Sequence, residues 1–188
     1  RMAQQTSRME GLVEDLLLLA RLECKPDEDI ESLELLDSID VSEVLARLCL
    51  SGDGIDTLHS RLNLSLQSGL KIRGKAKDLE SVFTNLIVNA MKYSDEDSKI
   101  DISWKVVSSG VKFEVQDYGD GIAEEHIPRL TERFYRVDVG RSREKGGTGL
   151  GLAIVKHVLA NHDSKLIITS KVGEGSRFSC IFPRSRCC

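Results

Sequence analysis

"GGTGLGLAIVKHV", residues 146–158, holds four glycines within its first six positions and then continues with the apolar spacing of a helix. Backbone N–H groups of a glycine-rich turn that enters a helix form a site for anions, so phosphate is the first ligand to consider. A P-loop is excluded, because Leu152 and Ala153 occupy positions that require Lys and then Ser or Thr. Leu152 also replaces the third glycine of a dinucleotide-binding fingerprint. For this stretch alone, a phosphate site and a turn built for packing both stay open.

The composition predicts one folded domain with an appendage. Of the 188 residues, 40% are hydrophobic and 30% are charged, and the net charge of −4 gives no global basic field that would favour nucleic acid. The apolar run "LLLLA", residues 16–20, is far shorter than a membrane span. The five cysteines show no metal-binding spacing, which favours reduced thiols. We therefore expect a cytoplasmic chain, with any membrane segment preceding residue 1.

Residues 1–23 have the pattern of a long amphipathic helix, in which Met9 and Leu16 lie seven residues apart, as do Val13 and Ala20. This helix either packs on its own domain or joins a helical bundle with another chain. The second interpretation is favoured, because a proline-broken acidic linker follows at once. We therefore divide the chain into a helix at 1–24, a linker at 25–40 and a domain at 41–188.

Helical and alternating patterns follow one another along the domain. Ser42 is the expected N-cap of its first helix. A layer of helices over a mixed sheet, an α/β architecture, accounts for this order of elements. We predict helices at 41–50, at 77–94 and after the glycine-rich turn, strands at 62–66 and 70–74, a hairpin at 99–122, a polar loop with some helix at 123–148, and a hairpin at 165–183.

Two asparagines and a lysine follow one strip of the predicted helix at 77–94. Asn85, Asn89 and Lys92 stand at i, i+4 and i+7 and lie beside its apolar face. Asparagine is a poor helix former, so two of them in one helix interior need a reason. Their carbonyl oxygens suit a hard cation such as Mg²⁺, which phosphates usually carry. The alternative is a pair of surface amides.

Two further stretches carry candidate ligand-binding groups. In "DYGDGI", residues 117–122, the carboxylate of Asp117 is a suitable acceptor for the amino group of adenine, and the glycines would let the base approach. A tight turn at the end of a strand is the alternative. "RFYRVD", residues 133–138, offers Tyr135 and Arg136 beside a basic segment that either closes over phosphates or is a solvated loop.

In this order, the stretches resemble the motifs of the catalytic ATP-binding domain of sensor histidine kinases. The N box corresponds to "NLIVNAMKYS", the first glycine box to "DYGDG", the F box to "RFYRVD" and the second glycine box to "GTGLGL". "GEGSRF", residues 173–178, matches the last glycine stretch of the family. The helix "TSRMEGLVEDLLLLARLE" resembles the second helix of the family's dimerisation domain, so the resemblance covers nearly the whole chain.

The resemblance implies a two-layer sandwich of helices on a mixed sheet, the Bergerat ATP-binding fold, with ATP and Mg²⁺ as ligands. Asp117 would bind the adenine amino group. Asn89 and Asn85 would coordinate Mg²⁺. Lys92 and Arg136, together with Asn85, are the expected catalytic side chains. The residues expected to surround the nucleotide are Asn85, Asn89, Lys92, Tyr93, Asp117, Gly119, Gly121, Ile122, Tyr135, Arg136, Gly147, Thr148, Gly149, Leu150, Gly151, Leu152 and Ser176.

The chain departs from the family at the phosphoacceptor, because it contains no H-E-x-R-T-P-like box. Surface or packing roles are expected for His59, His126, His157 and His162. We expect the chain to begin inside the second dimerisation helix and to transfer the γ-phosphate to a histidine that it lacks, and thence to a response regulator. The full-length protein would be a homodimeric inner-membrane sensor with this part in the cytosol. The alternative is a nucleotide-binding interaction module without kinase activity.

Overall fold

The computed structural model describes residues 2–23, 36–50, 61–137 and 148–188. Its elements in chain order are α1 (Met2–Glu23), β1 (Asp37–Asp40), α2 (Val41–Leu50), β2 (Leu62–Leu66), β3 (Lys71–Gly74), α4 (Ala76–Tyr93), β4 (Ile100–Val107), β5 (Gly110–Asp117), the 3₁₀ helix η2 (Glu124–Arg129), α6 (Gly151–Asn161), β6 (Ile167–Lys171), β7 (Gly175–Pro183) and the 3₁₀ helix η3 (Arg184–Arg186).

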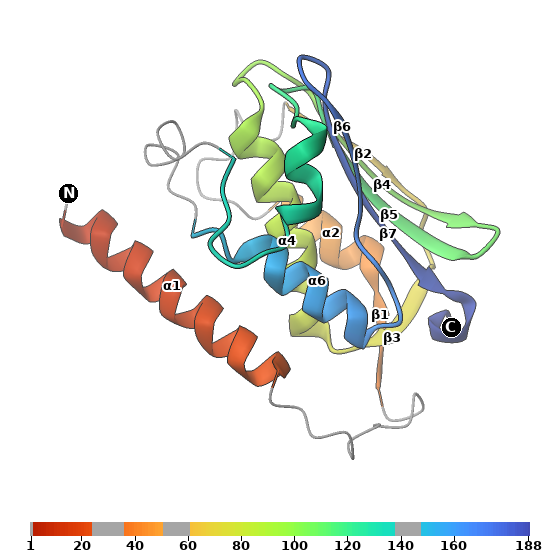
Figure 1. Cartoon of the computed structure of the whole chain (residues 1–188). Helices are drawn as coiled ribbons and strands as arrows, with labels where there is room; N and C mark the ends of the chain where they lie inside the picture. The colour runs from red at the N-terminus through yellow and green to blue at the C-terminus, as the bar shows by residue number, and fades with distance from the viewer. Residues whose placement is uncertain (1, 24–35, 51–60, 138–147) are drawn as a thin grey trace.

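A five-stranded mixed sheet forms one layer of the fold, with the strand order β2-β4-β5-β7-β6. The first pair is parallel, and the other neighbours are antiparallel. The helices α2, α4 and α6 lie against one face of this sheet (Figure 1). The predicted two-layer α/β class is therefore confirmed, as are both predicted hairpins.

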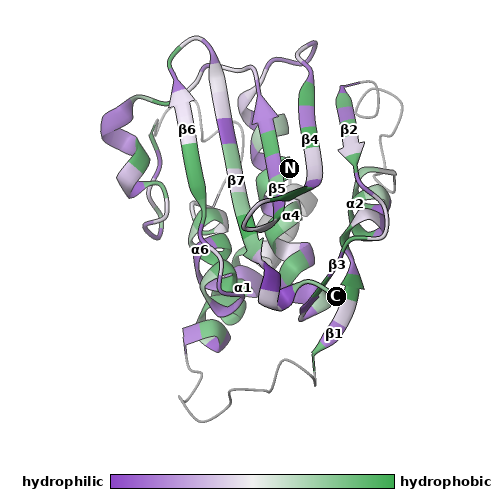
Figure 2. Ribbon diagram, turned by 90° about the vertical axis from the view of Figure 1, so that its right-hand side faces the viewer, coloured by the Kyte–Doolittle hydropathy of each residue, from purple (hydrophilic) through white to green (hydrophobic). Residues whose placement is uncertain are grey.

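The alternation of residues in the central strand β5 explains why one face of the sheet is apolar and buried. Val111, Phe113 and Val115 point to the helices and are buried, whereas Lys112 between them is partly exposed. The strands accordingly show bands of hydrophobic and hydrophilic residues (Figure 2). The ring of Phe113 meets that of Phe83 from α4 with 4.7 Å between the centroids. Full burial of such a side chain contributes about 1.5–3 kcal/mol to stability.

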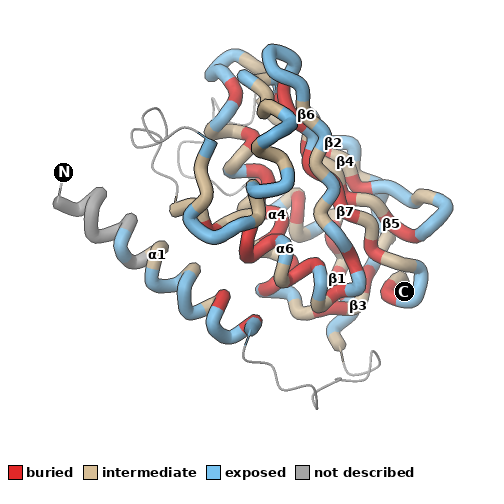
Figure 3. The backbone as a smooth tube through the Cα atoms, in the orientation of Figure 1, coloured by how far each residue is buried: buried red, intermediate tan, exposed pale blue. Residues whose placement is uncertain are grey.

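The apolar face predicted for the helix at 77–94 is the face that α4 buries. Buried residues gather between the helices and the sheet (Figure 3). The amide strip lies beside this face rather than in it, since Asn85 and Asn89 are only partly buried. The buried hydrophobic residues of α4 are Leu79, Val82, Phe83, Leu86, Ile87 and Ala90.

The predicted N-cap of the helix at 41–50 is wrong by two residues. Oδ1 of Asp40 accepts the backbone N–H groups of Ser42 and Glu43 at 3.1 and 3.4 Å. The Ser42 hydroxyl itself donates to the same oxygen, at 2.8 Å. Asp40 is therefore the side chain that satisfies the first turn of α2, and its negative charge also suits the positive end of the helix.

The segment predicted as a linker at 25–40 ends in a strand. β1 pairs with β3 in a separate two-stranded antiparallel sheet, and Ile39 is its one buried residue. A four-residue strand with a single apolar side chain gives too little alternation to detect among acidic neighbours. Residues 24–35 lie outside the part of the chain that the structure describes.

The helix α1 packs on its own domain through its C-terminal half, beside α6 (Figure 1). Leu19 and Leu22 are buried in the common core, and Arg21 donates to Oδ1 of Asp78 at 2.8 Å. The own-domain interpretation thus holds for this half. The favoured partner-chain interpretation stays a prediction for its exposed stripe, which comprises Met9, Val13, Leu16 and Leu17. None of the helices in the described ranges is long and apolar enough to cross a membrane.

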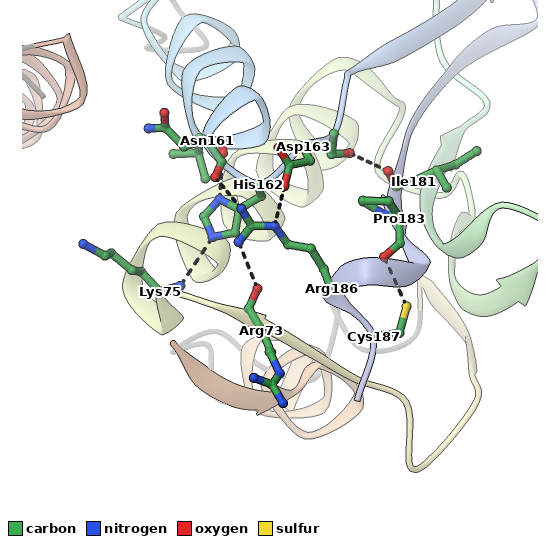
Figure 4. Close-up of polar contacts among 11 residues, drawn as sticks. Arg73, Lys75, Asn161, His162, Asp163, Ile181, Pro183, Arg186 and Cys187 are labelled. Atoms are coloured by element: carbon green, nitrogen blue, oxygen red, sulfur yellow. Dashed lines mark hydrogen bonds and ion pairs between the residues drawn. The ribbon is translucent and has the colours of Figure 1, made fainter. Parts of the chain in front are cut away.

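A buried arginine ties the C-terminal end of the chain to the helix layer (Figure 4). Nε of Arg186 donates to Oδ2 of Asp163 at 2.9 Å, and Nη2 donates to the carbonyl oxygen of Asn161 at 3.0 Å. Nη1 donates to the carbonyl oxygen of Arg73 at 3.3 Å. One guanidinium therefore joins η3, the end of α6 and β3.

His162 joins the end of α6 to the start of α4 beside this arginine, so its predicted packing role is correct. Its ring is buried, and Nε2 accepts the backbone N–H of Lys75 at 3.3 Å. Nδ1 donates to the carbonyl oxygen of Val158 at 2.7 Å. The ring closely faces Gly74, where an added Cβ would lie 2.7 Å from Nε2.

We predict that Arg186→Ala lowers the free energy of unfolding by about 2–4 kcal/mol, because it leaves three acceptors without their buried charged donor. Urea unfolding followed by circular dichroism measures the change. Arg184→Ala is the matched control, since Arg184 is exposed in the same short helix, and we expect a change within about 0.5 kcal/mol. Equal effects of the two substitutions would contradict the assigned role of Arg186.

Candidate functional site

A cavity of about 340 Å³ lies where α4, the end of β5 and the start of α6 meet. Its size falls within the range of small-ligand sites, about 300–1,000 Å³. Asn89, Asp117 and Gly149 come from three separate motifs and all line this cavity. So does every other site residue predicted from the sequence except Gly119, Gly147 and Leu150.

These three exceptions have different explanations. Leu150 is fully buried, so its side chain belongs to the hydrophobic core and only its backbone borders the glycine turn. Gly119 packs against the end of α4, where an added Cβ would lie 2.0 Å from the carbonyl oxygen of Tyr93. Gly147 lies outside the described residues.

This packing corrects the interpretation of Gly119 in the first glycine box. Gly119 and Gly121 were expected to let a base approach closely. Gly119 does not line the cavity, whereas Gly121 does, so its closeness to a base stays a prediction. An added Cβ at Gly121 would lie 2.1 Å from the carbonyl oxygen of Lys171. Gly121 also has φ of 69°, which disfavours other residues. Both glycines therefore allow elements to approach one another at the cavity wall.

Asp117 is a buried carboxylate with one engaged oxygen. It is 2% exposed, and its Oδ1 accepts the backbone N–H groups of Gly119 and Ser176, both at 3.1 Å. Among the described residues, no hydrogen bond goes to Oδ2 of this cavity-lining side chain. Burial raises the pKa of the Asp117 carboxyl above its ordinary value, and the two N–H groups lower it in part. Oδ2 is thus a fixed acceptor at one end of the cavity.

Ser170 organises the surroundings of Asp117, and the sequence interpretation missed it. Its hydroxyl accepts the backbone N–H of Ile122 at 2.8 Å and donates to the carbonyl oxygen of Gly175 at 2.9 Å. The Ser176 hydroxyl lies 2.9 Å from the hydroxyl oxygen of Ser170. Ser176 is itself buried and lines the cavity. No pattern in β6 distinguishes Ser170 from any other polar residue of an alternating strand.

The two amides of α4 differ in how firmly they are held. Nδ2 of Asn85 donates to the carbonyl oxygen of Ser81 at 2.9 Å, and Oδ1 faces the start of α6, where a Cβ at Gly151 would lie 2.3 Å from it. Asn89 also lines the cavity, and its side chain has no hydrogen bond to any described residue. The Asn89 amide is therefore available to a ligand, and Asn85 packs against the helix entrance.

Lys92 and Tyr93 close the end of the amide strip. Nζ of Lys92 lies 5.8 Å from the centroid of the Tyr93 ring, and both side chains line the cavity. Burial raises the pKa of the Tyr93 hydroxyl, and the positive charge of Arg136 opposes this shift. The aromatic ring and the two cations thus share one wall of the cavity.

The segment after η2 brings an anchored tyrosine and a poorly satisfied arginine to the cavity. The Tyr135 hydroxyl lies 2.7 Å from Nδ1 of His126, and the guanidinium of Arg129 lies 4.2 Å from the centre of the Tyr135 ring. Nε and Nη2 of Arg136 are buried and have no hydrogen-bond partner among the residues that the structure describes. Buried donors of this kind usually have a partner, so their position on a cavity wall points to a ligand acceptor.

The glycine-rich turn shapes the opposite wall. Gly149 has φ of 75°, which disfavours other residues, and its carbonyl oxygen accepts the backbone N–H of Phe134 at 2.9 Å. The Thr148 hydroxyl accepts the N–H of Leu150 at 3.2 Å. The N-terminal end of α6 begins at Gly151 and lines the cavity, so its positive dipole end faces the ligand space.

Several lining residues escaped the sequence interpretation. Val88 could have been found from helical spacing, because it lies on the same strip as Asn85 and Lys92 and is half-exposed although apolar. The remaining additional residues either lie in segments without periodicity or were predicted only as part of a hairpin. The additional lining residues are Val88, Asp120, Leu130, Val137 and Phe178.

Residues 74–186 match the family of histidine kinase-, DNA gyrase B- and HSP90-like ATPases. The chain belongs to this family. Among relatives of the histidine kinase type, the phosphate regulon sensor protein PhoR of Pseudomonas aeruginosa is 41% identical, over 96% of this chain and 40% of that protein. PhoR of Haemophilus influenzae is also 41% identical, over 97% of this chain and 42% of that protein.

Further relatives agree with this assignment. The sensor-like histidine kinase SenX3 of Mycolicibacterium smegmatis is 34% identical over 97% of this chain and 47% of that protein. The chain therefore spans less than half the length of these curated relatives. Residues 74–186 are its ATPase-family domain, and the resemblance of its motifs to those of sensor histidine kinases is confirmed.

Solved histidine kinases have the same fold. Full-length ShkA in complex with AMPPNP has a TM-score of 0.75 and 24% identity, over 96% of this chain and 36% of that one. The Acinetobacter baumannii histidine kinase AdeS has a TM-score of 0.75 and 24% identity, over 98% of this chain and 82% of that one. The predicted ATP-binding fold of this ATPase family is therefore confirmed.

We predict that Asp117→Asn is more stable than the wild type at neutral pH. Burial raises the pKa of Asp117 in the folded state, so its favourable contribution is present below the unfolded pKa and is lost as pH rises through the folded pKa. The asparagine keeps an acceptor for Gly119 and Ser176 but has no charge to bury.

Urea unfolding at neutral and acidic pH measures this difference, which should shrink as the pH falls. Asp97→Asn is the control, because Asp97 is exposed. An Asp117→Asn variant that is less stable than the wild type at neutral pH would show that ionised Asp117 stabilises the fold.

Proposed function

We propose that the chain binds Mg²⁺-ATP in this cavity and transfers the γ-phosphate to a histidine on its own dimerisation domain. The observation that carries the proposal is the polarity of the cavity. A buried carboxylate stands at one end. Along the rest of its wall stand two arginine nitrogens and an amide that have no hydrogen bond to any described residue. Such a site complements a ligand with a donor at one end and negative charge at the other.

The carboxylate end suits adenine. Oδ2 of Asp117 would accept the exocyclic amino group, because a carboxylate is acceptor-only and Oδ1 is already engaged. Ile122 and Phe178 line the same cavity and would contact the base, and Tyr93 would lie near the base or sugar. Ser176 would act through water. Guanine presents a carbonyl oxygen where adenine has its amino group, so this end also gives selectivity.

The other end suits phosphates and a cation. Arg136 would donate its unpaired Nε and Nη2 to the γ-phosphate, and Lys92 would add positive charge. The backbone of the turn at 148–151 would cradle phosphate oxygens at the start of α6. The carbonyl oxygen of Asn89, with Asn85 as second candidate, fits Mg²⁺, a hard cation that prefers oxygen ligands. Bound Mg²⁺ would neutralise the charge that develops on the phosphates.

The proposed reaction needs a histidine from outside the part that binds ATP. Phosphoryl transfer is mainly positioning and charge stabilisation, for which these side chains are suited. In this proposal residues 1–24 belong to the dimerisation domain, 25–40 to the linker and 41–188 to the catalytic domain. The names of the PhoR relatives support a sensor of the phosphate regulon. The resemblance to sensor histidine kinases further implies a homodimeric inner-membrane protein, with this part in the cytosol and a response regulator as the next acceptor.

A nucleotide-binding module without kinase activity is the alternative. ATP-hydrolysing members of the family resemble this chain in their N box but place a glutamate where Asn85 stands. An amide cannot activate water as a base, so slow hydrolysis is expected here. The buried nitrogens of Arg136, which have no partner among the described residues, favour the kinase, because a purely structural nucleotide site does not need a buried cation for the last phosphate.

We predict that Asp117→Asn weakens Mg²⁺-ATP binding by about 10- to 100-fold, which matches the loss of one hydrogen bond to a charged acceptor. The selectivity for ATP over GTP should disappear with it. Calorimetric titration of both nucleotides with the wild type and the variant measures this, with Asp97→Asn as the control. An unchanged ATP affinity in Asp117→Asn would refute the assigned adenine end.

We predict that the chain forms no acid-labile phosphate by itself with γ-labelled ATP and transfers phosphate to its full-length dimerisation domain supplied in trans. Arg136→Ala should reduce the transfer rate about 100-fold, because charge stabilisation of the γ-phosphate is lost. Arg184→Ala, which is remote from the cavity, should transfer at the wild-type rate. Rapid ATP hydrolysis without transfer would instead support an ATPase of the gyrase type.

A further inference from the structure

The helix α1 reaches the glycine-rich turn from the side opposite the sheet. Oδ2 of Asp15 accepts the hydroxyl of Thr148 at 3.2 Å, across 133 residues of sequence. Thr148 lines the cavity, and its hydroxyl oxygen also accepts the backbone N–H of Leu150 at 3.2 Å. One side chain thus joins α1 to the turn that leads into α6.

A second contact reaches the other side of the same turn. The carboxylate of Glu23 pairs with Arg133, and Nε2 of His157 on α6 lies 3.5 Å from it. Arg133 precedes Phe134, whose backbone N–H donates to the carbonyl oxygen of Gly149. Phe134 has φ of 62°, so the backbone beside Gly149 is itself strained. The two segments that meet at the Phe134–Gly149 hydrogen bond are therefore both next to residues that contact α1, namely Arg133 and Thr148.

Apolar burial fixes α1 between these two polar contacts. Leu19 and Leu22 are buried against the domain, and Asp15, Leu19 and Glu23 follow one another at four-residue spacing on one helix face. The carboxylates at both ends of this face are thus delivered to the turn by the packing of α1 rather than by a loop.

We propose that Asp15 is a positioning residue for the phosphate cradle and acts through Thr148. This inference rests on the proposed nucleotide site. A threonine hydroxyl has one proton. Donation of that proton to Asp15 directs the lone pairs of the oxygen to the N–H of Leu150, which fixes the turn around Gly149.

The proposed bond makes α1 docking and nucleotide binding favour each other. Without Asp15, the Thr148 hydroxyl is free to rotate, and a nucleotide has to order the turn when it binds. By linkage, a bound nucleotide strengthens the docking of α1 by the same factor. The charge of Asp15 acts in the opposite sense, because a carboxylate repels phosphates. The effect of the hydrogen bond and the effect of the charge can be separated, because Asp15→Asn keeps the acceptor for Thr148 and removes the charge.

The test measures the affinity for Mg²⁺-AMPPNP in a set of variants. Asp15→Ala should weaken binding about fivefold, which corresponds to about 1 kcal/mol. Asp15→Asn should bind within twofold of the wild type or more tightly. Glu14→Ala is the matched control, because it removes the same charge from an exposed neighbour on α1 and should leave the affinity unchanged. Circular dichroism verifies that each variant keeps the wild-type fold.

A double-mutant cycle identifies the route through Thr148. Thr148→Val should weaken binding by at least as much as Asp15→Ala, and the double variant should be no weaker than Thr148→Val alone. Additive losses, tighter binding by Asp15→Ala, or equal losses in Asp15→Asn would each overturn the proposal. Absence of Mg²⁺-AMPPNP binding by the wild type would refute the proposed nucleotide site itself, a result distinct from wild-type binding that Asp15→Ala leaves unchanged.

Discussion

The burial of one carboxylate at the end of the central strand is the constraint on which the site depends. A charge removed from water costs several kcal/mol unless it is compensated, and the backbone N–H groups of Gly119 and Ser176 supply part of that compensation at a single oxygen of Asp117. These groups reach Oδ1 only because glycines let the turn after β5 approach the end of α4 and the start of β7. The other carboxylate oxygen is then left as an acceptor on a side chain that lines the cavity.

The two ends of the cavity differ in how far the protein satisfies its own polar groups. Around Asp117, Ser170 and Ser176 form a closed network in which each hydroxyl has a partner. Along the proposed phosphate wall, by contrast, neither two buried nitrogens of Arg136 nor the Asn89 amide has a hydrogen-bond partner among the described residues. A nucleotide would therefore meet a preorganised surface at its base and supply missing partners at its phosphates. Under the proposed function, binding energy at the phosphate end would be used to assemble the groups that stabilise transfer.

Much of this fold and site could be predicted from the sequence, because the patterns that predict them involve residues close together in the chain. Helical periodicity places Asn85, Asn89 and Lys92 on one strip of a helix. Alternation of apolar and polar residues likewise predicts the strands of the hairpins. What escaped prediction depends on distant contacts. Asp40 rather than Ser42 caps α2, and Ser170 gains its role only when β6, β7 and the turn after β5 converge. The purpose of Gly119 was likewise misjudged, because only the folded chain shows the carbonyl oxygen of Tyr93 behind it.

The position of α1 adds a physical argument about how such a domain is controlled. Its two carboxylates at Asp15 and Glu23 lie on a helix that contacts the domain through buried leucines and a few polar side chains, while the rest of its apolar stripe stays exposed. A helix with so small a contact can exchange one docking surface for another at a cost of a few kcal/mol. Because the same helix contacts both sides of the Gly149 turn, any partner that draws it away also removes Asp15 from Thr148. Under the proposal, the geometry of the phosphate site would therefore depend on where the helix is docked.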